Sequence, residues 1–268
     1  MYVVNANGAC IPGIGIGTWK LQGRICARIV EQALEIGYRH IDTAQSYENE
    51  SEVGEGLHAS GVKREEVFLT TKVNSIYFAS GDLERSAEES LVRLRQPYVD
   101  LLLLHRPNPS IPLAETLGAL AHAKRRGLTR HIGVSNFNVG LVEEAVKICP
   151  EPLVCNQVEY HPYLDQPNLK VACNQAGLAI VAYSPIAMGK INNDETLEQI
   201  GRLYRKTPAQ ISLRWLVQQG AVVIPRTSRP ERLSENINIL DFQLTVAEMD
   251  RIYQLGSPEG RIHLGSFV

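Results

Sequence analysis

VDLLLLH, residues 99–105, is a short apolar run that ends in a histidine, and it decides the fold class of this chain. A run this short and apolar on both faces is typical of a parallel β-strand that helices cover on each side. Amphipathic stretches flank it, Leu83–Leu94 before it and Leu113–Arg126 after it. A helix, a buried strand and a second helix are the repeating elements of an α/β fold.

The same alternation continues along the chain. We expect eight strands, at Ile14–Ile16, Tyr38–Asp42, Val67–Lys72, Val99–His105, His131–Val134, Val154–Glu159, Leu178–Tyr183 and Ala221–Pro225. Gly37, Gly127, Gly177 and Gly220 each precede a strand, which suits a helix that ends in the left-handed conformation. Eight such units in about 250 residues favour a closed (β/α)8 TIM barrel over an open sheet.

Three segments lie outside the eight units. Met1–Pro12 is predicted to form a short N-terminal hairpin that turns at Asn7-Gly8. Asp194–Arg205 and Val246–Leu255 are predicted to be two extra helices. Because no linker or low-complexity segment interrupts the βα rhythm, we predict a single domain over residues 1–268.

Composition excludes several classes of protein. The net charge of −2, from 27 basic and 29 acidic residues, argues against nucleic-acid binding, which needs an excess of Lys and Arg. No apolar run approaches the roughly 20 residues that span a bilayer, and the residues after Met1 do not resemble a signal peptide. We therefore expect a cytoplasmic protein without a membrane partner. The five cysteines show no C-x-x-C spacing, which indicates free thiols in or near the core and gives no reason to expect a metal.

Four polar residues stand at the predicted carboxyl ends of strands, where a barrel builds its active site. Asp42 ends the second strand, Tyr47 follows in its loop, Lys72 ends the third strand and His105 ends the fourth. Reduction of a carbonyl needs a hydride from a cofactor and a proton, which a Tyr can donate if a nearby Lys lowers its pKa. The Asp would keep the Lys charged and oriented, and the His would hydrogen-bond the carbonyl oxygen.

Each of these residues also has a plain structural explanation. A lysine at a strand end lies more often on the surface than in an active site. Asp42 could cap a helix, and His105, which follows four leucines, could be a core histidine with its hydrogen bonds satisfied. Four polar residues at one rim of a barrel nevertheless favour the catalytic interpretation.

Five motifs occur in a fixed order: Gly15–Trp19 (GIGTW), Gly37–Ala44 (GYRHIDTA) with Tyr47, Thr71-Lys72, Val99–His105 and Gly133–Phe137 (GVSNF). They resemble the aldo-keto reductases, and the similarity runs from about residue 5 to residue 256. It is closest to bacterial members of the 2,5-diketo-gluconate reductase type. The resemblance implies that Asp42, Tyr47, Lys72 and His105 form the catalytic tetrad, with Tyr47 as general acid.

The resemblance also implies NADPH/NADP+ as the cofactor. Ser135, Asn136 and Gln157 match positions that hold the nicotinamide carboxamide, and Tyr183 matches the ring that stacks on the nicotinamide. The other implied cofactor-binding residues are Gly17, Thr18, Trp19, Asp42, Ser184, Pro185, Ile224, Pro225, Arg226, Thr227, Ser228, Arg232, Glu235 and Asn236.

The arginines of that set resemble the family's site for the adenosine 2′-phosphate. Arg226 and Arg232 could clamp a phosphate, with Thr227 and a helix N-terminus adding donors, whereas the alternative is a solvated basic turn. The run Gly13–Gly17 (GIGIG) does not indicate a dinucleotide-binding fold, because its spacing is GxGxG and no helix follows at once. We expect these glycines to let the backbone bend near the cofactor.

Two departures from the family pattern concern the substrate. The family often has Trp after the catalytic His, where this chain has Arg106, and Asn74-Ser75 stands where a Trp-containing pair is common. The expected substrate residues are Trp19, Tyr47, His105 and Arg106. If Arg106 faces the pocket, it favours small, oxygen-rich or anionic carbonyls; alternatively, it turns outward and pairs with a loop carboxylate.

The sequence therefore predicts NADPH-dependent reduction of a small aldehyde or ketone, which includes dicarbonyls and keto-sugar acids, by a monomeric enzyme. One alternative is a non-catalytic, cofactor-binding regulatory relative on the same fold. Another is a barrel aldolase that forms a Schiff base through Lys72.

Overall fold

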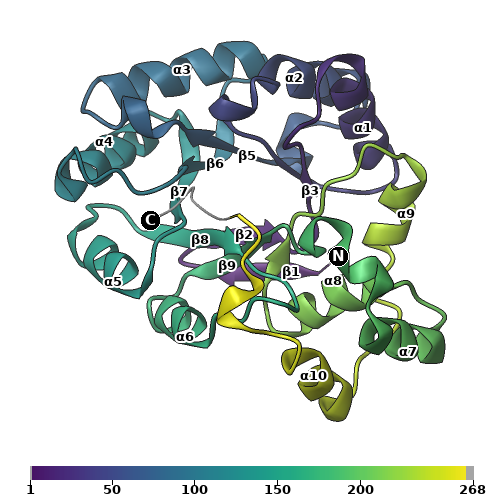
Figure 1. Ribbon diagram of the computed structural model, residues 1–268. Helices are drawn as coiled ribbons and strands as arrows, with labels where there is room; N and C mark the ends of the chain where they lie inside the picture. The colour runs from purple at the N-terminus through teal and green to yellow at the C-terminus, as the bar shows by residue number, and fades with distance from the viewer. Residues whose placement is uncertain (1, 264–268) are drawn as a thin grey trace.

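Each apolar run that was predicted to be a strand contributes one, and the strands pair in parallel in chain order. Within residues 2–263, which this computed structural model describes, the barrel strands are β3 (Ile16–Gly17), β4 (His40–Asp42), β5 (Phe68–Val73), β6 (Val99–Leu104), β7 (Thr129–Ser135), β8 (Leu153–Glu159), β9 (Ala179–Tyr183) and β10 (Val222–Val223). A parallel bridge between Ile14 and Val223 joins the two end strands. The predicted (β/α)8 TIM barrel is confirmed (Figure 1).

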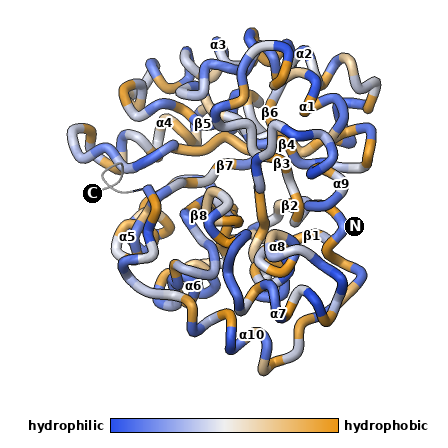
Figure 2. Tube along the Cα trace, turned by 45° about the vertical axis from the view of Figure 1, so that its right-hand side comes forward, coloured by the Kyte–Doolittle hydropathy of each residue, from blue (hydrophilic) through white to orange (hydrophobic). Residues whose placement is uncertain are grey.

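Helices surround the sheet and turn their apolar faces toward it. In α1 the buried positions include Cys26, Ile29, Val30 and Ala33, a helical spacing that places them on one face. The surrounding helices are α1 (Gly23–Glu35), α2 (Glu50–Ala59), α3 (Asp82–Leu94), α4 (Leu113–Arg125), α5 (Val139–Ile148), α6 (Pro167–Gln175), α8 (Pro208–Gln218) and α9 (Glu231–Ile237). The two predicted extra helices are α7 (Glu195–Tyr204) and α10 (Val246–Tyr253). Figure 2 shows hydrophobic strands inside and helices of alternating hydropathy outside.

The N-terminal hairpin closes one end of the barrel. Its strands, β1 (Val3–Ala6) and β2 (Ala9–Pro12), pair antiparallel across Asn7 and Gly8, whose φ angles of 42° and 89° are those of a tight hairpin turn. Ile11 packs with barrel residues such as Phe68 and Leu101 in one buried cluster. The hairpin leaves the opposite end of the barrel, where the strands terminate, open to a ligand.

Glycines serve two purposes in this barrel. Gly37, Gly127, Gly177 and Gly220, predicted to be left-handed, have φ between 70° and 109°. Gly15 instead permits a close approach, because a Cβ there would lie 2.8 Å from the ring of His40 on the next strand. The GIGIG run thus lets the short β3 pack against β4, as well as bringing Gly17 to the rim.

Two further observations concern the described residues. No helix within residues 2–263 is long and apolar enough to cross a membrane.

The cysteines of this part are free thiols: Cys26, Cys155 and Cys173 are buried and Cys149 is partly buried. Cys10 is exposed, so the expectation of a thiol in or near the core was wrong there, because strand β2 turns that residue outward.

Candidate active site

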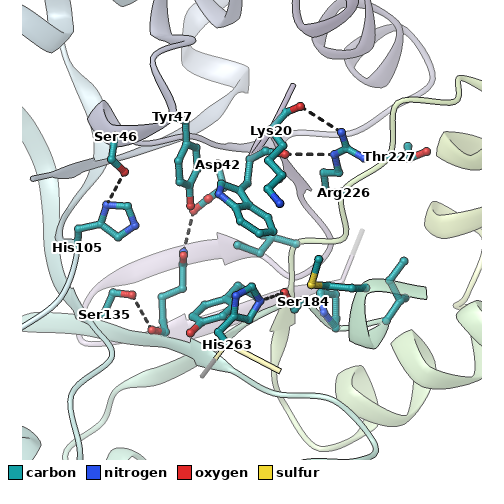
Figure 3. A pocket seen from close by; sticks show the side chains of 18 of the residues that line it. Lys20, Asp42, Ser46, Tyr47, His105, Ser135, Ser184, Arg226, Thr227 and His263 are labelled. Carbon is teal, nitrogen blue, oxygen red and sulfur yellow. Dashed lines mark hydrogen bonds between the residues drawn. The ribbon is translucent and has the colours of Figure 1, made fainter. Parts of the chain in front are cut away.

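A cavity of about 610 Å³ lies at the carboxyl ends of the barrel strands (Figure 3). Its volume is within the range of about 300–1,000 Å³ that is usual for ligand sites. The lining comes from loops that follow most of the strands, as expected for a barrel whose opposite end is closed.

Three of the four predicted catalytic residues are in direct contact. Asp42 is the last residue of β4, Lys72 lies in the neighbouring β5, and Tyr47 ends a single turn of 3₁₀ helix, η1 (Gln45–Tyr47). The Lys72 Nζ donates to Asp42 Oδ1 at 2.6 Å, to the carbonyl oxygen of Thr43 at 2.8 Å and to Tyr47 Oη at 3.3 Å. The Lys72 side chain is only 1% exposed, so the expectation of a surface lysine does not apply.

Asn49 fixes the loop that carries Tyr47. Its fully buried side chain accepts a hydrogen bond from the Thr43 hydroxyl at 2.8 Å and donates to the carbonyl oxygens of Thr18 and Leu21 at 2.8 and 2.9 Å. These bonds tie the loop after β4 to the loop after β3. Sequence reasoning missed Asn49, because its partners lie up to 31 residues away along the chain.

The charges around Tyr47 act in opposite directions on its acidity. Burial raises the pKa of Tyr47 above its ordinary value, and the Lys72 ammonium opposes that rise. Burial alone would lower the pKa of Lys72, but the Asp42 carboxylate and the Tyr47 phenol together raise it. Lys72 therefore stays charged beside the Tyr47 oxygen.

His105 lies next to Tyr47 of this cluster. It follows β6, its ring lies edge-on to Tyr47 with centroids 5.6 Å apart, and its Nδ1 is 3.2 Å from the Ser46 hydroxyl (Figure 3). Burial lowers the pKa of His105 to about 3, with the positive charges of Lys72 and Arg106 adding to the effect. The imidazole is therefore neutral at physiological pH.

The strands on the other side of the barrel contribute amides and a ring. Gln157 Nε2 donates to Asp42 Oδ2 at 2.7 Å, and the Ser135 hydroxyl donates to the Gln157 carbonyl oxygen at 2.8 Å. The Tyr183 hydroxyl donates to Asn136 Oδ1 at 2.9 Å, while Asn136 Nδ2 donates to the His105 carbonyl oxygen at 3.1 Å. These bonds connect the residues predicted to hold a nicotinamide with those predicted to be catalytic.

A group of cations lines the far part of the cavity, after β10. Arg226, Arg229 and Arg232 line it together with Thr227 and Ser228. The Arg226 guanidinium donates to the carbonyl oxygens of Trp19 and Lys20 at 3.1 and 3.2 Å, so it joins the loops after β3 and β10 (Figure 3).

A family model described as Aldo/keto reductase family matches residues 13–257. This chain belongs to that family. Methylglyoxal reductase DkgB of Escherichia coli O157:H7 is 39% identical over 259 residues, which cover 93% of this chain and 97% of that protein. Glyoxal reductase of Bacillus subtilis (strain 168) is 39% identical over 254 residues, which cover 94% of this chain and 92% of that protein.

Solved structures agree with this assignment. A protein provisionally named 2,5-diketo-D-gluconic acid reductase B superposes with a TM-score of 0.96 at 46% identity, over 98% of this chain and 94% of that one. The aldo-keto reductase of Bombyx mori in complex with NADP superposes with a TM-score of 0.90 at 35% identity, over 95% of this chain and 92% of that one.

Most residues predicted to bind the cofactor line the cavity of this aldo/keto reductase, but some do not. Those outside the lining are Thr18, Pro225, Glu235 and Asn236. The Thr18 hydroxyl donates to the Asp42 carbonyl oxygen at 3.1 Å, and Glu235 accepts from the Thr207 hydroxyl at 2.6 Å. In this structure these two side chains hold elements of the reductase together.

The cavity of the reductase also has lining residues that sequence analysis did not assign to the site. They are Lys20, Ser46, Asn74, Ser75, Ile186, Met188, Gly189, Arg229 and His263. His263 lies beyond the last helix, α10, in a segment to which the sequence analysis gave no role. Its ring lies edge-on to Trp19 and Tyr183, with centroids 5.4 and 5.5 Å away, and its Nε2 is 2.9 Å from the Ser184 hydroxyl.

A buried carboxylate holds that segment in place. Glu159, at the end of β8 and fully buried, accepts hydrogen bonds from the backbone N–H groups of Ile262 and His263 at 2.6 and 3.2 Å. Its Oε1 is also 3.0 Å from His161 Nε2. These hydrogen bonds lower the pKa of Glu159 despite its burial, which alone would raise it.

Proposed function

We propose that this protein uses NADPH to reduce a small aldehyde or ketone to the alcohol, with Tyr47 as the proton donor. The observation that carries the proposal is the buried contact of Lys72 with both Asp42 and the Tyr47 oxygen, beside a neutral His105 at the rim of the cavity. The curated relatives named above, a methylglyoxal and a glyoxal reductase, act on small carbonyl compounds by name.

The residues of the cavity fit NADPH by their chemistry. Arg226 and Arg232, with Thr227 and Ser228 between them, are donors suited to phosphate groups. Ser135, Asn136 and Gln157 are suited to an amide, and the Tyr183 ring is suited to a flat heterocycle. When bound, NADPH supplies the hydride that adds to the carbonyl carbon.

Tyr47 is the better of two candidates for the proton donor. With a pKa of about 3, His105 is neutral at physiological pH and holds no readily donated proton. When the Ser46 hydroxyl donates to His105 Nδ1, Nε2 carries the hydrogen and can donate a hydrogen bond to the carbonyl oxygen. His105 then positions the carbonyl, while the Tyr47 hydroxyl donates the proton to the oxygen as the C–H bond forms.

Lys72 and Asp42 support Tyr47. As the proton leaves, the charge that develops on the Tyr47 oxygen lies 3.3 Å from the Lys72 ammonium, which stabilises it. Asp42 keeps that ammonium charged in a buried place. The same pairing disfavours a Schiff base, because an amine nucleophile must first lose the proton that Asp42 stabilises.

A panel of small aldehydes, ketones and dicarbonyls with NADPH, followed by the loss of nicotinamide absorbance, tests the proposal. We expect turnover of several members of the panel, and its complete absence would favour the regulatory alternative. Borohydride trapping with a carbonyl compound, followed by mass spectrometry, should leave Lys72 unmodified; a trapped adduct would favour the aldolase.

A further inference from the structure

One wall of the cavity is polar and lies on the tetrad side, away from the arginines that follow β10. It consists of Ser46, Asn74, Ser75 and Arg106, from the loops after β4, β5 and β6. A polar wall beside the reacting carbonyl favours a substrate that carries polar groups of its own.

Hydrogen bonds fix the position of Arg106 in that wall. The Arg106 Nε donates to the Ser75 hydroxyl at 3.1 Å, and Asn108 Nδ2 donates to the Ser75 carbonyl oxygen at 2.8 Å. The Ser75 side chain is buried, so the guanidinium is held from its Nε side. Its two terminal nitrogens make no hydrogen bond with any residue in the range 2–263.

The charge of Arg106 is not balanced by a neighbouring acid. Within residues 2–263 no carboxylate pairs with Arg106, so the alternative in which it turns outward to a loop carboxylate does not occur there. Asp42 is the one acidic residue among the described lining residues, and it is already bonded to Lys72 and Gln157. An anion that enters this part of the cavity therefore meets an unpaired cation.

The remaining cations of the lining lie elsewhere. Lys20 follows β3, with its ammonium 4.4 Å from the centre of the Trp19 ring. Arg226, Arg229 and Arg232 follow β10, where the proposed function places the phosphates of the cofactor. Arg106 follows His105 directly, at the end of β6. A guanidinium in this place can bind a carboxylate through two parallel N–H···O bonds while the carbonyl of the same molecule reaches His105.

We propose that Arg106 binds the carboxylate of the substrate, so that the preferred substrates are small carbonyl compounds that carry a carboxylate away from the reacting carbon. This inference rests on the proposed function. Arg106 would hold the carboxylate while the carbonyl group of the same molecule lies beside Tyr47 and His105. Arg106 therefore determines substrate specificity and takes no part in the proton transfer.

The test compares two compounds that share one aldehyde and one carbon chain, 4-oxobutanoate and its neutral methyl ester. With NADPH, the wild-type enzyme should show a kcat/KM at least about tenfold higher for the acid, equivalent to about 1.4 kcal/mol. In R106Q this preference should disappear, mainly through a higher KM for the acid. Because Arg106 is exposed, added salt should also reduce the wild-type preference.

The matched control is R24Q. Arg24 is also exposed and lies in the first turn of α1, near the same end of the barrel, but it does not line the cavity. R24Q removes the same charge, so it should keep the preference for the acid if a direct contact with Arg106 is responsible. An equal loss in R24Q and R106Q would overturn the contact in favour of a general effect of charge.

The two proposals fail in different ways. If the wild-type enzyme reduces the ester but shows no preference for the acid, or if R106Q keeps that preference, the role of Arg106 is overturned while the reductase activity stands. If the wild-type enzyme reduces neither compound nor any member of the carbonyl panel, the proposed function fails and the inference falls with it.

Discussion

Replacing Lys72 with methionine should abolish turnover and also weaken the fold, and the two losses can be separated. Methionine fills nearly the same volume but carries no charge. It therefore removes the ammonium that lies 2.6 Å from Asp42 and 3.3 Å from the Tyr47 oxygen. Because Lys72 lowers the pKa of Tyr47, its loss raises that pKa further and makes the phenol a weaker acid.

The structure gives the size of both effects. Breaking a buried ion pair from one side costs about 3–5 kcal/mol, because the remaining charge is left without its partner. Gln157 still donates to Asp42 at 2.7 Å, so we expect the lower end of that range. For a domain of this size the midpoint of thermal unfolding should fall by on the order of 10 °C. Loss of an effective general acid should reduce kcat by at least about 100-fold.

A second variant separates activity from stability. In the double variant D42N/K72M both charges are gone, so no buried carboxylate lacks a partner. We expect its unfolding midpoint to lie above that of K72M, while its kcat stays as low. The measurements are thermal unfolding by circular dichroism and turnover at a temperature at which each variant is fully folded. A folded K72M enzyme with near wild-type kcat would refute the role given to Lys72.

Three other perturbations test separate parts of the site. Tyr47→Phe removes only the phenol oxygen, so kcat should fall by at least about 100-fold. The affinity for NADPH, measured by fluorescence titration, should stay within a few-fold of the wild-type value. Near-normal turnover would show that Tyr47 is not the proton donor. The wild-type enzyme should prefer NADPH to NADH by more than about tenfold in kcat/KM, because an arginine–phosphate contact is a charge-assisted hydrogen bond. Arg232→Ala should reduce that preference. Equal use of both cofactors by the wild-type enzyme would contradict the phosphate site. Glu159→Gln should speed amide hydrogen exchange at Ile262 and His263, because it removes the carboxylate that accepts hydrogen bonds from both N–H groups. Mass spectrometry measures this exchange. Unchanged exchange would mean that other contacts hold the segment.

The fold could be predicted because its signals are local. A buried parallel strand such as β6 is apolar at nearly every position, and a left-handed glycine such as Gly127 marks the end of the helix before the next strand. The ends of strands are not set by such local signals: the eighth strand, predicted at Ala221–Pro225, forms only at Val222–Val223. Pro225 has no N–H to donate to a neighbouring strand, although its carbonyl oxygen still accepts from Gly17 at 3.0 Å.

The candidate site could be predicted in part, because parallel strands bring their carboxyl ends to one rim. That rule places Asp42, Lys72 and His105 together without any knowledge of loop structure. It says nothing of residues that reach the rim from distant segments. His263 arrives there through bonds between its segment and Glu159, which is 104 residues away. No local pattern in the sequence specifies such a contact.

Two cations on neighbouring strands show why residue type alone does not give a role. Lys72 and Arg106 both stand near the carboxyl end of a strand, and taken singly each could be a solvated surface residue. Lys72 is buried and donates hydrogen bonds to three oxygen atoms, so its ammonium group is already paired with Asp42 and Tyr47. Arg106 is exposed, bonded through Nε alone among the described residues, and free to bind an anion. The surroundings of the two residues therefore distinguish the charge that we propose stabilises the Tyr47 oxygen from the charge that we propose binds the substrate.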